Sequence, residues 1–216
     1  MACKSYKLTT IQTSCGSNIP SIKKMWIGQF ESAEATLTYV QMPDPEDPEH
    51  STIDYKDADG NKVIEAITGL TLDVTKYDYW VEFQFRKNTC SASSEMTVND
   101  NGTHYFTNAL NMVLAKQDTA KRLNIQSIAS GDCACIYMDG NGKYWMIGLN
   151  DPVTLTSASA NTGTAVGDSN QYELVLSEDA ATMPIEIVGT KGTPDVTPQD
   201  IVNGLLEPAE DDGEGE

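Results

Sequence analysis

The sequence predicts a mainly β protein in which an antiparallel sheet packs against one helix. The strongest observation is a hairpin at residues 133–149, where the apolar runs CACIYM and KYWMIGL flank a DGNG turn. Glycine and asparagine accept the positive φ that tight hairpin turns require. Further β-prone segments along the chain are the second observation, and an amphipathic helix directly before the hairpin is the third.

The helix is expected to begin after Asp118 and to end near Gly131. Asp118 is a suitable N-cap residue, and glycine commonly follows a helix end. Its apolar residues fall loosely on one side of the helix: Ala120, Leu123, Ile125 and Ile128. A length of about a dozen residues suits one amphipathic helix that lies on a sheet.

The remaining strands follow from period-two alternation and from turn residues. Residues 104–116 alternate apolar and small polar side chains, and an NDNG turn at residues 99–102 links them to the preceding strand. That preceding region covers residues 79–98, and WVEFQF is its clearest part. Four other segments read as strands: residues 22–30, 62–70, 172–176 and 185–188.

Three segments lack the apolar pattern of a strand or helix that packs in a hydrophobic core. Residues 41–50 contain three prolines and four acids, so they predict a protruding loop, which extends to residue 59. Residues 153–170 are rich in small polar residues and predict a long loop or a weakly paired edge. Residues 207–216 contain six acids and predict a disordered tail, which leaves residues 1–206 as a single β domain.

Charge and composition exclude several classes of function. The formal net charge is −18, from 32 acidic and 14 basic residues, so we expect the protein to repel a nucleic-acid backbone. No run approaches the roughly 20 apolar residues of a membrane helix, and no apolar run of signal-peptide length follows the N-terminus. We therefore expect no membrane partner and a cytoplasmic location. Five cysteines fit that compartment as free thiols.

No catalytic or metal-binding pattern stands out, so we expect neither an enzyme nor a cofactor. The only histidines are His50 and His104, which lie in the acidic loop and beside a turn. A calcium-loop pattern at residues 55–66 fails at both ends, because Tyr55 and Ala66 stand where acidic ligands belong. Six aromatic residues could form a sugar-stacking platform, although core packing is their commoner use: Tyr77, Tyr79, Trp80, Tyr137, Tyr144 and Trp145.

Several motifs together resemble the tail tube proteins of long-tailed bacteriophages, in particular tube-like proteins from phages and prophages of Bacteroides-type hosts. The first is the opening, MACKSYKLTT followed by SCGSNIPSIKKMWIG. The second joins HYFTNALNMVLAK, the helix and GDCACIYMDGNGKYWMIGLNDPV. The third is the closing segment, SASANTGTAVGDSNQYELVLSEDAATMPIEI. The resemblance covers most of residues 3–188.

The resemblance implies two packed antiparallel sheets, a sandwich or near-barrel, flanked by one α-helix. It also implies hexameric rings whose inner sheets join into one wall, with the rings stacked into a tube through which DNA passes without specific binding. The partners would be further copies and other phage tail proteins. The location would be the virion tail, after assembly in the host cytoplasm.

In this family a long loop after the second strand commonly contacts the next ring, and the acidic loop has the matching position. Its candidate contact residues are Pro43, Asp44, Pro45, Glu46, Asp47, Pro48, Glu49, Asp57 and Asp59. The candidate basic counterparts are Lys23 and Lys24, or else Lys116, Lys121 and Arg122. Two other functions stay open: another β-rich virion part (a tail terminator, connector ring or capsid-decorating protein) and a carbohydrate-binding module.

Overall fold

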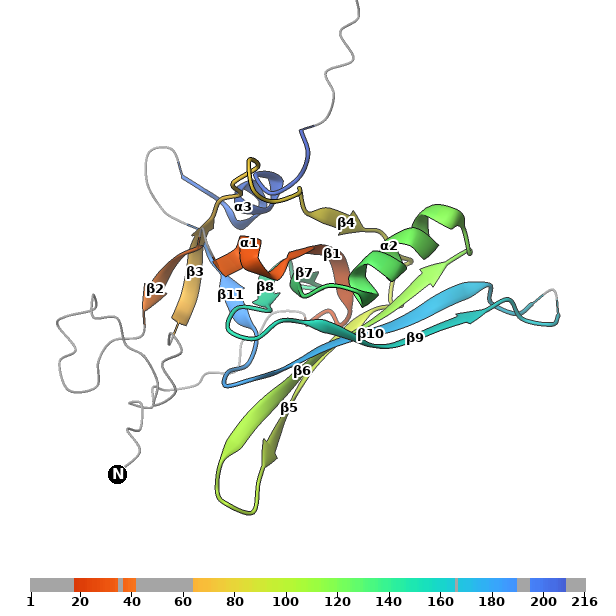
Figure 1. Ribbon diagram of the computed structural model, residues 1–216, viewed down its shortest axis with the longest axis horizontal. Coiled ribbons are helices and arrows are strands. Elements are labelled where there is room, and N and C mark those ends of the chain that lie inside the picture. The colour runs from red at the N-terminus through yellow and green to blue at the C-terminus, as the bar shows by residue number, and fades with distance from the viewer. Residues whose placement is uncertain (1–17, 35–36, 42–63, 166, 190–194, 209–216) are drawn as a thin grey trace, which may run out of the picture.

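The computed structural model describes residues 18–34, 37–41, 64–165, 167–189 and 195–208. They form two sheets with three short helices (Figure 1). The larger sheet has seven strands, in the order β2 (Leu37–Gln41), β3 (Ile64–Leu70), β11 (Ile185–Ile187), β8 (Tyr144–Ile147), β7 (Cys133–Asp139), β1 (Ile22–Gln29) and β4 (Val81–Phe83). The smaller sheet has four, in the order β5 (Ser91–Val98), β6 (His104–Ala115), β10 (Gln171–Ala180) and β9 (Thr154–Asn161).

One hydrophobic core lies between the two sheets. Buried Leu110 and Met112 of β6 and Leu174 of β10 belong to the same cluster as Met25 of β1 and Cys135 of β7. Helix α2 (Thr119–Ala129) adds Ile125 and Ile128 to this cluster. The prediction of two packed, mainly antiparallel sheets with a flanking helix is confirmed.

A second cluster covers the other face of the seven-stranded sheet. There Trp26 and Ile136 pack with Ile201 and Val202 of helix α3 (Pro198–Asn203). Helix α1 (Phe30–Glu34) contributes Ala33. Strand β7 is therefore buried on both faces, which explains why its sequence is a continuous apolar run without alternation.

Several expected elements occur as expected. The hairpin joins β7 to β8, and in its turn Gly142 has φ +86°. Asp118 caps α2, because its side chain accepts a hydrogen bond from the Lys121 backbone N–H at 2.8 Å. Residues 99–102 form the expected turn between β5 and β6, closed by Gly102 N–H donating to the Asn99 carbonyl at 2.9 Å.

Other expectations need correction. Residues 79–98 are not one strand region, because β4 and β5 belong to different sheets and residues 84–90 cross between them. Of the two alternatives left open for residues 153–170, a long loop or a weakly paired edge, residues 154–161 adopt the second, as the edge strand β9. Leu123 is 53% exposed, so the apolar side of α2 is narrower than the sequence suggested.

Helix α3 was not predicted, although its signal is present in the sequence. Thr197 and Asp200 form a reciprocal capping box, and Pro198 occupies the first turn. None of the helices among the described residues is long and apolar enough to span a bilayer.

Candidate functional site

The four-stranded sheet is the candidate functional site, because one of its faces and both of its edges lack a partner among the described residues. Alternation along β6 and β10 divides the sheet into two faces. Leu110, Met112 and Leu114 of β6 are at most 2% exposed and point into the core, as do Leu174 and Leu176 of β10. The residues between them point away from the core and form what we call the polar face.

The strand registers define the polar face. One row across the sheet is Glu95, Thr107 and Asp179, and the next is Ser93, Ala109 and Ser177. The remaining rows contain Thr97, Tyr105, Ser91, Asn111, Val175, Ser157, Val113, Glu173, Ser159, Ala115, Gln171 and Asn161. The face therefore consists mostly of small and polar side chains, with three carboxylates and with Tyr105, Val113 and Val175 as its larger apolar members.

The charge on the polar face has a single sign. Its acids are Glu95, Glu173 and Asp179, and the four strands contain no lysine or arginine. Hydrogen bonds hold two of the carboxylates in place: Thr107 Oγ1 donates to Asp179 Oδ1 at 2.6 Å, and Gln171 Nε2 donates to Glu173 Oε1 at 2.7 Å. The face repels anions, and it offers them no cationic partner.

Strands β5 and β9 form the two edges of this sheet, and we call them the β5 edge and the β9 edge. In β5, Ala92 and Ser94 are partly buried and the other residues are exposed; in β9, Leu155 is partly buried and the others are exposed. Sheet edges are usually protected by lysine, proline or bulges. The β5 edge carries Glu95 as its one charged residue, and the β9 edge carries none.

A register shift near Thr156 is the one irregularity of the β9 edge, and its ladder is regular from Ser157 to Asn161. The two edges run in opposite directions, because each of the three neighbouring pairs in the sheet is antiparallel. Both edges are therefore open for backbone pairing, with opposite strand directions.

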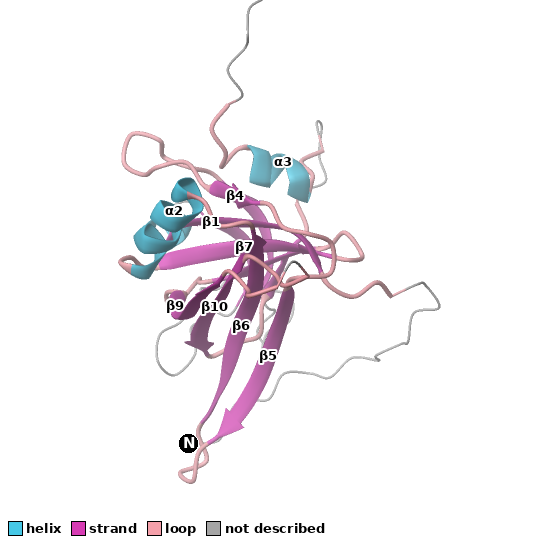
Figure 2. Ribbon diagram, turned by 90° about the vertical axis from the view of Figure 1, so that its right-hand side faces the viewer, coloured by secondary structure: helices cyan, strands magenta, loops and turns pink. Residues whose placement is uncertain are grey.

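The β5–β6 hairpin projects beyond the rest of the molecule (Figures 1 and 2). Its apolar residues Met96 and Val98 are 58% and 61% exposed, and each lies opposite an aromatic residue, Phe106 or His104. The rings of His104 and Phe106 meet edge to face, with centroids 6.4 Å apart. Two aromatic side chains and two exposed apolar ones thus lie on the projecting part of the hairpin.

A buried polar network anchors this sheet to the larger one. Asn108 Nδ2 donates to Glu178 Oε1 at 2.8 Å, and the Gly148 backbone N–H donates to Glu178 Oε2 at 2.6 Å. Ser94 Oγ of β5 donates to Asn108 Oδ1 at 2.6 Å, which extends the network to the edge strand. Burial is the main reason that the pKa of Glu178 is raised to about 7, and Asp151 and Asp179 add repulsion.

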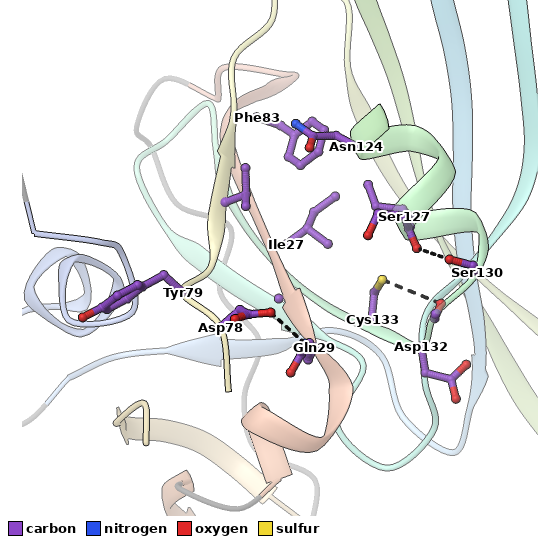
Figure 3. Close-up of a pocket in the computed structure, with 14 residues that line it drawn as sticks. Ile27, Gln29, Asp78, Tyr79, Phe83, Asn124, Ser127, Ser130, Asp132 and Cys133 are labelled. Atoms are coloured by element: carbon purple, nitrogen blue, oxygen red, sulfur yellow. Dashed lines mark hydrogen bonds between the residues drawn. The ribbon is translucent and has the colours of Figure 1, made fainter. Parts of the chain in front are cut away.

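The described structure also contains an open groove of about 360 Å³ between α2 and strands β1 and β4 (Figure 3). Ile27 and Phe83 face Asn124 and Ser127 across it. Cys133 lines the groove too, but burial raises the pKa of its thiol, which disfavours the nucleophilic thiolate. No histidine lines the groove, so its described residues provide no nucleophile–base pair.

The predicted ring-contact residues fall into two groups. The acidic loop, with all its candidate residues from Pro43 to Asp59, lies outside the described residues. The five basic candidates are described, and the side chains of three of them are already engaged within the chain. Lys24 Nζ lies 3.9 Å from Glu82 Oε2, Lys121 pairs with Asp118, and Arg122 Nη1 donates to Gln126 Oε1 at 3.5 Å.

Lys23 is exposed on β1, and Lys116 is exposed at the end of β6 with φ +64°. Lys23 and Lys24 lie on β1 of the larger sheet, whereas Lys116 follows β6 and Lys121 and Arg122 lie on α2. The two groups therefore do not form one patch. Because Lys121 and Lys24 already have carboxylate partners, Lys23 and Lys116 are the better candidates for an outside contact.

The described residues do not bring together the other side chains considered for catalysis, metal binding or sugar stacking. His104 is exposed on the projecting hairpin, and His50 lies outside the described residues. The described part of the chain brings together no three histidine, cysteine or acidic side chains that could hold a metal ion. Trp80, Tyr137 and Tyr144 are at most 7% exposed, whereas Tyr77 and Trp145 are partly buried and Tyr79 is 36% exposed, so the six aromatic residues do not all lie on one exposed surface.

Comparisons with protein-family models, with curated proteins and with solved structures give no match to this chain. The candidate site therefore depends on geometry alone. Sequence patterns could locate β6 and β10, but not the polar face, because its definition needs the register between strands that are far apart in the chain.

Proposed function

We propose that this chain is the subunit of a bacteriophage tail tube, which assembles into stacked hexameric rings around a channel for DNA. The observation that carries the proposal is the four-stranded sheet with two open edges of opposite direction. The resemblance along residues 3–188 implies stacked hexameric rings, and the sheet offers a physical means of closing a ring.

A rotated copy keeps its strand directions relative to the ring axis. The β9 edge of one copy and the β5 edge of the next would therefore meet as an antiparallel pair, because β5 and β9 are antiparallel within the chain. Such a head-to-tail contact closes into a ring when the rotation between copies divides a full turn. Ring closure would satisfy both edges of every copy without any change in the strand pattern.

The polar face supports the choice of this sheet as the channel wall. With the other face packed in the core, only the polar face is available to line a channel. Its three carboxylates, with no cation in the four strands, would repel phosphates and let DNA pass without binding. The partners in this proposal are further copies and other phage tail proteins, in the host cytoplasm during assembly and then in the virion tail.

Edge-blocking variants test the proposal. Successive N–H groups along a strand point to opposite sides, so one of Ala158→Pro and Ser159→Pro removes a donor from the open side of β9. The same holds for Met96→Pro and Thr97→Pro on β5. In each pair, one variant loses an N–H that bonds within the sheet and should unfold at a lower temperature. The variant that keeps the thermal midpoint of the subunit is therefore the edge-facing one. Glu207→Pro, outside both sheets, is the control.

We expect each edge-facing variant to give only subunits in sedimentation and electron microscopy, while the wild type and the control give rings and tubes. An equimolar mixture of the β5 variant and the β9 variant should give one-to-one pairs, since one intact edge remains on each chain. Single rings without tubes in the wild type would indicate a connector or terminator instead. Wild-type protein that stays monomeric at every concentration, or edge variants that still form rings, would overturn the proposal.

A further inference from the structure

The groove beside α2 has an apolar floor. Ile27, Val81 and Phe83 line one side and Ile128 lines the other; Val81 is 47% exposed, and the other three are at most 8% exposed. Strand β4, which carries Val81 and Phe83, is the edge of the seven-stranded sheet, so its outer side has no strand partner among the described residues. An open groove with an apolar floor, beside an unpaired edge, favours an extended peptide as occupant.

The groove has an acidic end. Asp78 and Asp132 both lie at the end opposite Phe83 and Asn124 (Figure 3). Gln29 Nε2 donates to Asp78 Oδ2 at 3.4 Å, and within the described part of the chain neither carboxylate has an ion-pair partner. An extended occupant with cations at one end would complement this charge.

The first residues of this same chain have that chemistry. No acid precedes Glu31, although the whole chain carries −18, and Lys4 and Lys7 lie in the first ten residues. Tyr6 and Leu8 alternate with Lys7 and Thr9, which is the period-two pattern of an extended segment with one apolar side.

The path from the described N-terminal residues to the groove is short. Ile19 and Pro20 line the same hollow as Phe85 and Lys87, which directly follow β4, and the Ile19 N–H donates to Asn141 Oδ1 at 2.9 Å. Four residues of strand from Phe85 back to Val81 cover about 13 Å. The 17 residues before Asn18 can extend to roughly 56–61 Å. Residues 3–12 can therefore reach the groove from the Phe83 end.

We propose that residues 3–12 of the same chain bind in this groove along β4, with Tyr6 and Leu8 on the apolar floor and Lys4, on the same side of the extended segment, beside Asp78 and Asp132. The direction of the path agrees with the charges, because the acidic end of the groove is the end farther from Phe85. Residues 3–12 would then cover the unpaired edge strand β4. This inference concerns the single chain and does not depend on ring formation.

Zero-length carbodiimide coupling of the full chain tests the proposal, because it joins a lysine amine to a carboxylate only when the two are in contact. Coupling is performed on a mixture of ¹⁴N- and ¹⁵N-labelled protein, and the linked peptides are identified by mass spectrometry. We expect Lys4 to be linked to Asp78 or Asp132 within one isotopic chain. Links between the two isotopes would assign the groove to a second copy and overturn the proposal, as would links spread over the other acids.

Charge exchange supplies the matched controls. Asp78→Lys/Asp132→Lys should remove the links, and adding Lys4→Glu should restore them with the partners exchanged. Asp100→Lys/Asp151→Lys makes the same charge change at exposed positions away from the groove and should leave the links intact. Hydrogen exchange gives an independent measurement: the amides of residues 5–11 should be protected in the wild type and lose protection in the Asp78/Asp132 variant. Wild-type amides that exchange at unprotected rates would also overturn the proposal.

Discussion

The two sheets of this fold differ in how many of their faces are buried. The seven-stranded sheet has a hydrophobic cluster on each face, one shared with the smaller sheet and one covered by α1 and α3. The four-stranded sheet is buried on one face only, and its two edge strands are mostly exposed. Stability is therefore concentrated in the larger sheet, while the smaller sheet has the free surface that an assembly contact requires.

Replacing one side chain on each sheet by alanine should reveal this difference in the free energy of unfolding. Ile136 of β7 is 0% exposed, whereas Val113 of β6 is only partly buried on the polar face. Ile136→Ala should cost about 2–5 kcal/mol because it leaves a cavity in a packed sheet. Val113→Ala should cost less than about 1 kcal/mol because the site is already in contact with solvent. Denaturant unfolding of both variants measures the two values.

Similar costs for the two variants would contradict the assignment of the polar face to solvent in the free subunit. If Val113→Ala became costly only in the assembled protein, the polar face would be buried by assembly. The channel role would then be wrong even if rings form.

The sequence correctly predicted the elements whose local pattern of apolar and turn residues matches their burial in the structure. The alternating strand β6, the β7–β8 hairpin and the Asp118 cap could all be predicted, because each depends on contacts between near neighbours in the chain. The continuous apolar run of β7 indicated a strand, but not that this strand is central or which residues cover its second face.

Other features depend on contacts between distant segments, and the sequence did not reveal them. The WVEFQF alternation predicted one strand, but β4 ends at Phe83, and Phe85 belongs to the loop that crosses to the second sheet. The two open edges could not be assigned, because strand order is set by pairing between residues some 70 positions apart, such as Phe106 with Ala180. The buried partners of Glu178 are also distant in sequence: Asn108 is 70 positions away and Gly148 is 30.

The contact between the sheets should make stability depend on pH through Glu178. Its folded-state pKa is raised from 4.5 to about 7, so between these values the folded protein holds a proton that the unfolded chain releases. The resulting stabilisation is complete below pH 4.5 and is lost as the pH rises to 7. At about 1.4 kcal/mol for each pH unit, the loss is roughly 3 kcal/mol relative to a Glu178→Gln variant, which has no titrating group at this site.

Unfolding by urea from pH 4.5 to pH 8 measures this difference, and Glu173→Gln on the polar face is the matched control. Both variants remove one carboxylate from an acidic protein, but only the Glu178 variant should flatten the pH dependence, because Glu173 is exposed. Parallel pH curves for the wild type and Glu178→Gln would mean that the carboxylate is solvated in solution and that the two sheets separate there.

Reversing the charge of the polar face should have the smallest effect on stability and a large effect on DNA binding. Glu173→Lys/Asp179→Lys replaces two exposed carboxylates, and each loses one side-chain hydrogen bond, with Gln171 or with Thr107. Such surface changes usually alter the free energy of unfolding by about 0.5 kcal/mol or less. Assembled tubes of the variant should nevertheless bind duplex DNA, with an affinity that falls steeply as salt increases, because the added lysines release counterions from phosphate. Wild-type tubes should not bind duplex DNA.

Filter binding of labelled DNA at several salt concentrations measures the affinity of both proteins, with Asp73→Lys/Asp100→Lys, outside the polar face, as the control for net charge. If the control binds DNA as well as the polar-face variant does, net charge alone explains binding, and the polar face has no special position relative to the DNA.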